Sequence, residues 1–116
     1  MDRKKTFDWI EDYPAAVTVC DDKGIIIAMN RRSMQQFRKQ GGEELIGSSL
    51  FDCHQESANT LIKDQLQSQK PNTYITQSKS ERRLIQQVPW YKNGVFAGLV
   101  ETTSPIPGDI PVRQRG

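Results

Sequence analysis

The chain has 116 residues, the length of a single domain, and a formal charge of only +2 from 16 basic and 14 acidic side chains. Because this charge is small and the basic residues are scattered along the chain, the sequence argues against a nucleic-acid partner. No apolar run is long enough to span a membrane, no apolar signal-peptide core is present, and the two cysteines lack metal-ligand spacing. We therefore expect a cytoplasmic protein with reduced thiols and no membrane partner.

The first predicted element lies in residues 1–12. Phe7 and Ile10 are one helical turn apart with Trp9 between them, and this spacing is typical of one or two helical turns. Thr6 is a suitable N-cap for those turns. We expect residues 1–12 to form a short helical cap on the domain.

The next stretch predicts a β-hairpin that is followed at once by a helix. Two β-rich runs, residues 15–20 and 25–29, flank a short polar segment, in which Gly24 can take the positive φ that a tight turn requires. Asn30 follows the second run directly, and its side-chain oxygen suits the N-cap of a helix that continues to Phe37.

The clearest helix spans residues 57–69, after a glycine pair at 41–42 and a single turn at 43–46. Its apolar side chains recur at helical spacing and form one stripe. Either Asp52 or Ser57 is suited to cap its start, and Pro71 ends it because proline lacks an N–H donor. The stripe consists of Ala58, Leu61, Ile62 and Leu66.

Three strands are predicted in the last third of the chain, within residues 72–80, 83–91 and 95–103. Asn93 and Gly94 both tolerate left-handed backbone, so they predict a tight turn between the last two strands. Pro89 in the interior of a strand favours a local bulge or a sheet edge. Residues 105–116 are rich in proline and show no periodicity, which indicates an extended tail.

This order of elements predicts an α+β fold. The two early strands and the three late ones are expected to form a five-stranded antiparallel sheet, with the helices packed on one face. The expected organisation is a cap at 1–12, a domain at 13–104 and a tail at 105–116.

Several features follow the pattern of one family: a proline before the first strand, an aspartate and a glycine in the first turn, an asparagine after the second strand, and an E-x-hydrophobic-hydrophobic-G step. In this chain they are Pro14, Asp21 or Asp22 with Gly24, Asn30, and Glu43 to Gly47, followed near the end by Val88 to Tyr91 and Gly98. With these features in this order, the segment from about Ile10 to Pro105 resembles a PAS domain of the non-photoreceptor type. The light-sensing branch is not matched, because Cys53 lies too late in the chain and has different neighbours.

The resemblance implies an interior between sheet and helices that often holds a small ligand, heme or flavin. The alternative is that the apolar side chains only pack against one another. On strand 83–91, alternation groups Trp90 with Gln86 on the face taken as the inner one, and Ile85 on the opposite face. The expected pocket residues are Val17, Val19, Ile27, Phe37, Phe51, Leu61, Ile62, Leu66, Gln86 and Trp90.

The candidate cofactor ligands are Cys53 and His54, since thiolate and imidazole both ligate heme iron. The resemblance favours a structural role for His54, because PAS domains that bind heme usually place the histidine on the helix before the third strand. Here that helix, residues 57–69, contains none. The leading expectation is therefore no cofactor, with a heme-bound redox or gas sensor as the alternative.

The expected function is a sensory and interaction module without catalysis of its own. The sequence contains no motif that joins a nucleophile to a base, so a small α+β enzyme is the weakest of the readings. The expected partners are a second copy of the chain, a signalling protein or effector such as a transcription regulator, and a small molecule. The expected interface residues are Phe7, Trp9, Ile10, Ile85, Tyr91 and Leu99.

Overall fold

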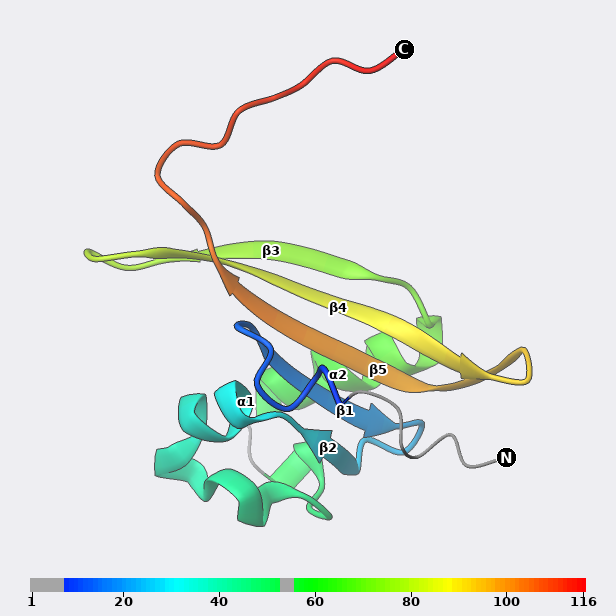
Figure 1. Ribbon diagram of the computed structural model, residues 1–116. Coiled ribbons are helices and arrows are strands. Elements are labelled where there is room, and N and C mark those ends of the chain that lie inside the picture. The colour runs from blue at the N-terminus through cyan, green and yellow to red at the C-terminus, as the bar shows by residue number, and fades with distance from the viewer. Residues whose placement is uncertain (1–7, 53–55) are drawn as a thin grey trace.

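The computed structural model describes residues 8–52 and 56–116. In these residues, five strands form one antiparallel sheet of order β2-β1-β5-β4-β3, and two α-helices and three short 3₁₀ helices lie on one side of it (Figure 1). The strands are β1 (Ala16–Asp21), β2 (Ile26–Met29), β3 (Asn72–Gln77), β4 (Arg82–Lys92) and β5 (Val95–Pro105). The helices are α1 (Arg31–Gln36), α2 (Glu56–Ser68) and the 3₁₀ turns Arg38–Gln40, Gly42–Leu45 and Leu50–Asp52. The predicted fold class is confirmed.

The turn between β1 and β2 forms because Asp21 closes it. Its Oδ1 accepts hydrogen bonds from the backbone N–H groups of Lys23 and Ile25, both at 2.9 Å. Gly24 has φ +84°, and a Cβ there would lie 3.0 Å from a ring carbon of Phe51. The sequence left open whether Asp21 or Asp22 forms this turn. The hydrogen bonds show that Asp21 forms it.

Asn30 joins three segments of the chain. Its Oδ1 accepts from the N–H of Ser33 at 3.0 Å, which caps α1 as predicted, and from the N–H of Val17 at 2.9 Å. Its Nδ2 donates to the carbonyls of Ala15 at 2.8 Å and Ile10 at 3.1 Å. A single buried side chain thus fixes α1, the start of β1 and the segment before it.

The β4–β5 hairpin turns at Asn93 and Gly94, both with positive φ (53° and 79°), as the sequence predicts. β3 pairs with β4 only as far as Gln87, so β4 is a sheet edge on that side beyond this residue. The pairing of β4 with β5 then shifts between Trp90 and Tyr91. The edge and the irregularity expected around Pro89 are both present.

The two ends of the chain differ in detail from the expected boundaries. Residues 8–12 form no helix; they make a turn in which Tyr13 N–H donates to the Ile10 carbonyl at 3.2 Å. At the other end β5 runs to Pro105, and Ile106 N–H still bonds the Arg82 carbonyl at 2.8 Å. Residues 107–116 leave the sheet without regular structure (Figure 1).

Apolar burial is concentrated on one side of the molecule. In the described residues, the buried apolar side chains belong to β1, β2, β4 and β5 and to the residue before β1, and α2 contributes none. On α2, Leu61 is 70% exposed. Helix α2 therefore faces the sheet without closing onto it. The buried apolar residues are Ala15, Ala16, Val17, Cys20, Ile26, Met29, Ile85 and Leu99.

Candidate functional site: a cleft between the sheet and helix α2

A cleft of about 920 Å³ separates α2 from the sheet. Its floor is the face of the sheet that carries Cys20, Leu99 and Tyr74, which we call the inner face. The α2 stripe predicted from the sequence supplies the opposite wall through Leu61 and Ile62. A concave, mostly apolar space of several hundred cubic ångströms is typical of small-molecule sites.

Polar side chains cross the floor of this cleft on three neighbouring strands. Gln87 on β4 donates from Nε2 to Oε2 of Glu101 on β5 at 2.7 Å. Asn72 on β3 donates from Nδ2 to Oε1 of Gln87 at 3.0 Å. The three residues are direct cross-strand partners, so the register of the sheet itself aligns them. We call Asn72, Gln87 and Glu101 the polar ladder.

Two titratable groups on the floor are held in their neutral forms. Burial raises the pKa of the Cys20 thiol, and the charges of Asp21 and Glu101 add to this effect. Burial also raises the pKa of the Tyr74 phenol, with a smaller contribution from Glu101. The raised pKa keeps the Cys20 thiol protonated at neutral pH, and the protonated thiol is the less nucleophilic form.

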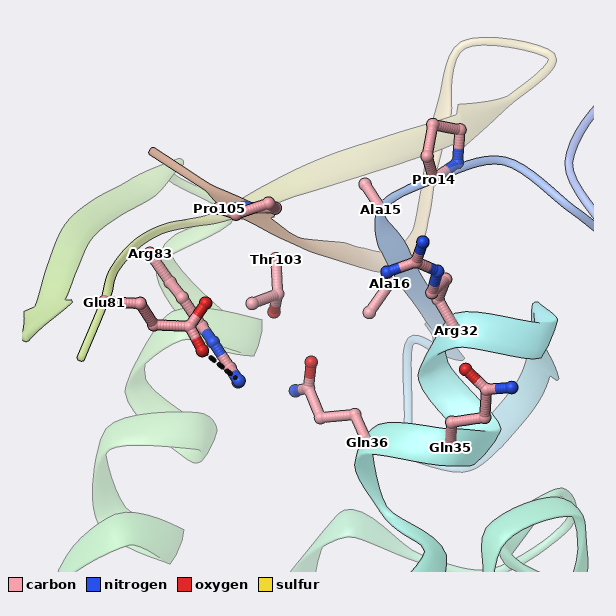
Figure 2. Close-up of a pocket in the computed structure, with 10 residues that line it drawn as sticks. All are labelled: Pro14, Ala15, Ala16, Arg32, Gln35, Gln36, Glu81, Arg83, Thr103 and Pro105. Atoms are coloured by element: carbon pink, nitrogen blue, oxygen red, sulfur yellow. Dashed lines mark hydrogen bonds and ion pairs between the residues drawn. The ribbon is translucent and has the colours of Figure 1, made fainter. Parts of the chain in front are cut away.

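A smaller hollow of about 320 Å³ lies where β1 begins and β5 ends (Figure 2). Arg32, Gln36 and Arg83 point toward this hollow, and Arg83 is paired with Glu81 at 2.9 Å. Both members of this pair are well exposed, so the ion pair is screened by solvent. The hollow is a polar feature of the surface, and the apolar cleft is the better candidate site.

The structure brings three of the predicted pocket residues to the cleft: Phe37, Leu61 and Ile62 all line it. Phe51 and Leu66 lie instead under the β1–β2 turn, where both come within 3.6 Å of a Cβ placed on Gly24. These two side chains support the hairpin and do not line the cleft.

The predicted inner face of β4 is wrong. Gln87 lines the cleft and its neighbour Gln86 is exposed, while Trp90 does not line the cleft and donates from Nε1 to the Cys20 carbonyl at 3.0 Å. Because side chains alternate across a strand, an error of one residue moves every side chain to the other face.

The same shift applies to the early strands. In β1, Thr18 and Cys20 line the cleft, whereas Val17 and Val19 lie on the outer face of the sheet. Ile27, on the edge strand β2, is 44% exposed and does not line the cleft.

Two of the six predicted interface residues are corrected as well. Ile85 and Leu99 are buried within the chain, because both lie on the inner face under the helices. Trp9 and Tyr91 are more than half exposed, and Ile10 is partly buried. Phe7, Cys53 and His54 lie outside the described residues.

Sequence reasoning missed two polar residues of the floor, Glu101 and Tyr74, and chose Gln86 where its neighbour Gln87 lines the cleft. Glu101 shares its face with Leu99 and Thr103, so a charge two residues from an inward apolar side chain was the available signal. Because Leu99 was assigned to an interface, there was no reason to assign Glu101, on the same face, to the pocket.

The comparisons with known proteins agree with this architecture. The family model of the PAS fold matches residues 10–71, more than half of the chain. The chain therefore belongs to the PAS family and has the fold of the sensory modules found in signalling proteins. No curated protein sequence matches it.

Solved structures of PAS domains share the fold at low sequence identity. The PAS domain of histidine kinase ThkA superposes with a TM-score of 0.63 at 17% identity, over 78% of this chain and 97% of that one. The PAS domain of Bordetella pertussis BvgS gives 0.64 at 13% identity, over 84% and 81% of the two chains. The Aer2 receptor from Vibrio cholerae, described as a dual PAS-heme oxygen sensor, gives 0.59 at 17% identity, over 80% and 95%.

In the residues that the structure describes, no group of three or more histidine, cysteine or acidic side chains is arranged to hold a metal ion. No helix in the same residues has the length and hydropathy needed to cross a bilayer.

Proposed function

We propose that the protein is a sensory module whose input is a small molecule bound in the cleft between α2 and the sheet. The observation that carries this proposal is the cleft of about 920 Å³ behind a helix that is not packed onto the sheet. A ligand in this space buries the apolar side chains of both walls, which stabilises the closed arrangement by about 25 cal/mol per Å² of apolar surface removed from water.

The signal in this proposal is the position of α2 relative to the sheet. Gln65 Nε2 lies 3.5 Å from the Gln87 carbonyl, a long contact that links the helix to β4 at the cleft. Binding that draws α2 toward the floor shortens such contacts, and the partner signalling protein or effector reads the change. The module itself performs no chemistry.

Native mass spectrometry of the purified protein tests the ligand directly, with Ala58→Trp as the variant that blocks the cleft. Ala58 lines the cleft on α2, so an indole there occupies the ligand's space. Ala28 is exposed on β2 and lies outside the cleft, so Ala28→Trp is the matched control. We expect a co-purified small molecule in the parent and the control and none in the blocked variant; equal retention by both variants would refute the proposal.

We also propose that the sheet dimerises through its outer face, with Trp9 and Tyr91 at the margin. Four apolar side chains lie on this face as two cross-strand pairs, with Gln86 and Thr102 between the pairs, and none of the four is buried: Ile75 with Leu84, and Val88 with Val100. An apolar patch on a sheet face away from the core usually marks an interface.

Analytical ultracentrifugation of Val88→Arg tests this dimer. A charge within one of the two apolar pairs is expected to shift the protein to monomer at micromolar concentration, whereas Ile27→Arg, on the exposed edge strand β2, is not. Equal sedimentation of Val88→Arg and the parent protein would exclude the outer face as the interface.

The heme-bound sensor is the second candidate function. It is favoured only by the likeness to a receptor described as a PAS-heme sensor, and its ligands would be His54 or Cys53. An absorbance spectrum decides it: a Soret band in the purified protein that is lost in His54→Ala or Cys53→Ser supports heme, and a protein without visible absorbance after reconstitution excludes it.

We place the module in the cytoplasm, upstream of an effector such as a transcription regulator.

A further inference from the structure

The chemical class of the ligand can be inferred from the floor of the cleft, if the cleft is the ligand site as proposed above. We propose that the cleft selects an apolar molecule that carries a protonated amine, and that Glu101 binds the amine. The inference rests on the polar ladder and on the charges that surround it.

The carboxylate of Glu101 has one oxygen free for a ligand. Oε2 accepts from Gln87, while Oε1 has no hydrogen-bond or ion-pair partner in the part of the chain that the structure describes. Glu101 is partly buried and lines the cleft. A half-satisfied carboxylate beside an apolar wall gains most from a donor or a cation that enters with the ligand.

The ladder holds this carboxylate in place. Asn72 Nδ2 donates to Gln87 Oε1, which orients the Gln87 amide. Gln87 Nε2 then donates to Glu101 Oε2, which orients the carboxylate. The ladder therefore ends at the Glu101 carboxylate, which can only accept hydrogen bonds. A ligand at this point must donate, which a protonated amine does and a carboxylate does not.

The remaining charges of the cleft favour a cation. Three charged residues line the cleft: Asp64 on α2, Lys70 just after α2, and Glu101. The charges of Asp64 and Lys70 cancel, so the described lining has a net charge of −1 from Glu101. In the described residues no lysine or arginine forms an ion pair with Glu101. An anionic ligand would meet this carboxylate without compensation.

A matched set of probes tests the inference: naphthylethylamine, naphthylethanol and naphthylpropionate, which share an apolar ring and differ in the polar group. Binding is measured at pH 7 by ¹H–¹⁵N chemical-shift titration, with affinity taken from the amides of the cleft. We expect the amine to bind about tenfold more tightly than the alcohol, and the propionate to bind most weakly.

Glu101→Gln is the decisive variant, because glutamine keeps the size of the side chain and an oxygen that accepts from Gln87. It should remove the preference for the amine while the alcohol binds as before. Glu44→Gln, an exposed change outside the cleft, should leave the preference intact.

The outcomes separate this inference from the proposed function. If the amine and the alcohol bind equally to the parent protein, or if Glu101→Gln keeps the preference, the inference is overturned and the ligand cleft stands. If none of the three probes shifts the cleft amides at millimolar concentration, both are overturned.

Discussion

At the scale of single residues, Asn30 joins α1, the start of β1 and the segment before it through one buried side chain. It is 3% exposed, and each of its two polar side-chain atoms makes two hydrogen bonds to backbone groups. Ser33, fully buried one turn later, bonds the hydroxyl of Thr18 and ties α1 to β1. Backbone groups that would otherwise be buried without partners are satisfied here by side chains.

Asn30→Ala is expected to destabilise the protein by about 3 kcal/mol or more, because it removes the cap of α1 and leaves buried backbone groups unpaired. Asn30→Asp keeps the acceptor and should cost less than alanine. The measurement is urea unfolding, with exposed Gln35→Ala as the control, expected within about 0.5 kcal/mol of the parent. A free energy of unfolding for Asn30→Ala equal to that of the control would contradict this account.

The buried thiol of Cys20 gives the stability an alkaline dependence. The unfolded chain releases this proton near its ordinary pKa, about pH 8.5, while the folded chain holds it to higher pH. Above that pH the unfolded state binds fewer protons, so stability falls as pH rises. In a Cys53→Ser background, Cys20→Ala should lessen the loss of unfolding free energy between pH 7 and pH 10. An unchanged loss would show that Cys20 does not titrate in this way.

At the scale of elements, the close approach of β1 and β5 depends on one glycine. Gly98 has φ +147°, and a Cβ there would lie on the Cys20 carbonyl oxygen, with an atom separation of 1.9 Å. Trp90, opposite Gly98 in the register, donates its indole N–H to that same carbonyl. The glycine thus allows β4, β5 and β1 to meet at this point.

Gly98→Ala should cost about 3 kcal/mol or more, since backbone atoms must move to relieve the contact. Gly94→Ala is the matched control: its φ is also positive, +79°, but no atom lies within 4 Å of the added Cβ. It should cost about 1 kcal/mol from backbone strain alone. Thermal unfolding of both variants measures the difference, and similar melting temperatures would refute the packing argument.

The elements were predictable from local signals, and the faces of the strands were not. Turn residues such as Gly24 and Asn93, and the N-cap Asn30, determine the backbone conformation within a few residues of their own positions. Their structural effect can therefore be predicted from the local sequence. On β4, Leu84 and Val88 form a more apolar set than Ile85 and Gln87, and the rule that apolar side chains face inward chose the first set. The structure turns the mixed set inward, so that Gln87 meets Glu101 across β4 and β5.

At the scale of the whole molecule, we expect the sheet to be the stable part and α2 the part that opens more easily. The buried apolar side chains belong to the sheet and the residue before it, while the cleft removes most contacts between α2 and the floor. Elements with few buried contacts open at lower free energy than the rest of a protein. A ligand stabilises the state that it binds, so a ligand in the cleft should raise the free energy needed to open α2.

Hydrogen–deuterium exchange should therefore show faster exchange for the amides of α2 than for those of β5 in the ligand-free protein. Naphthylethylamine at saturating concentration should slow exchange in α2 and leave β5 nearly unchanged. Equal protection of α2 and β5 without ligand would mean that the helix is packed as firmly as the sheet.

The sequence by itself determined the order of the elements from β1 onward, the turns between strands, the cap of α1 and the family, because each of these depends on residues close together in the chain. Only the tertiary structure decided which face of the sheet meets the helices and how far α2 stands from it. Alternation in a strand fixes two sets of side chains, but the choice between the sets depends on pairing across β1, β5, β4 and β3. That pairing brings Asn72, Gln87 and Glu101 into one line across three successive strands.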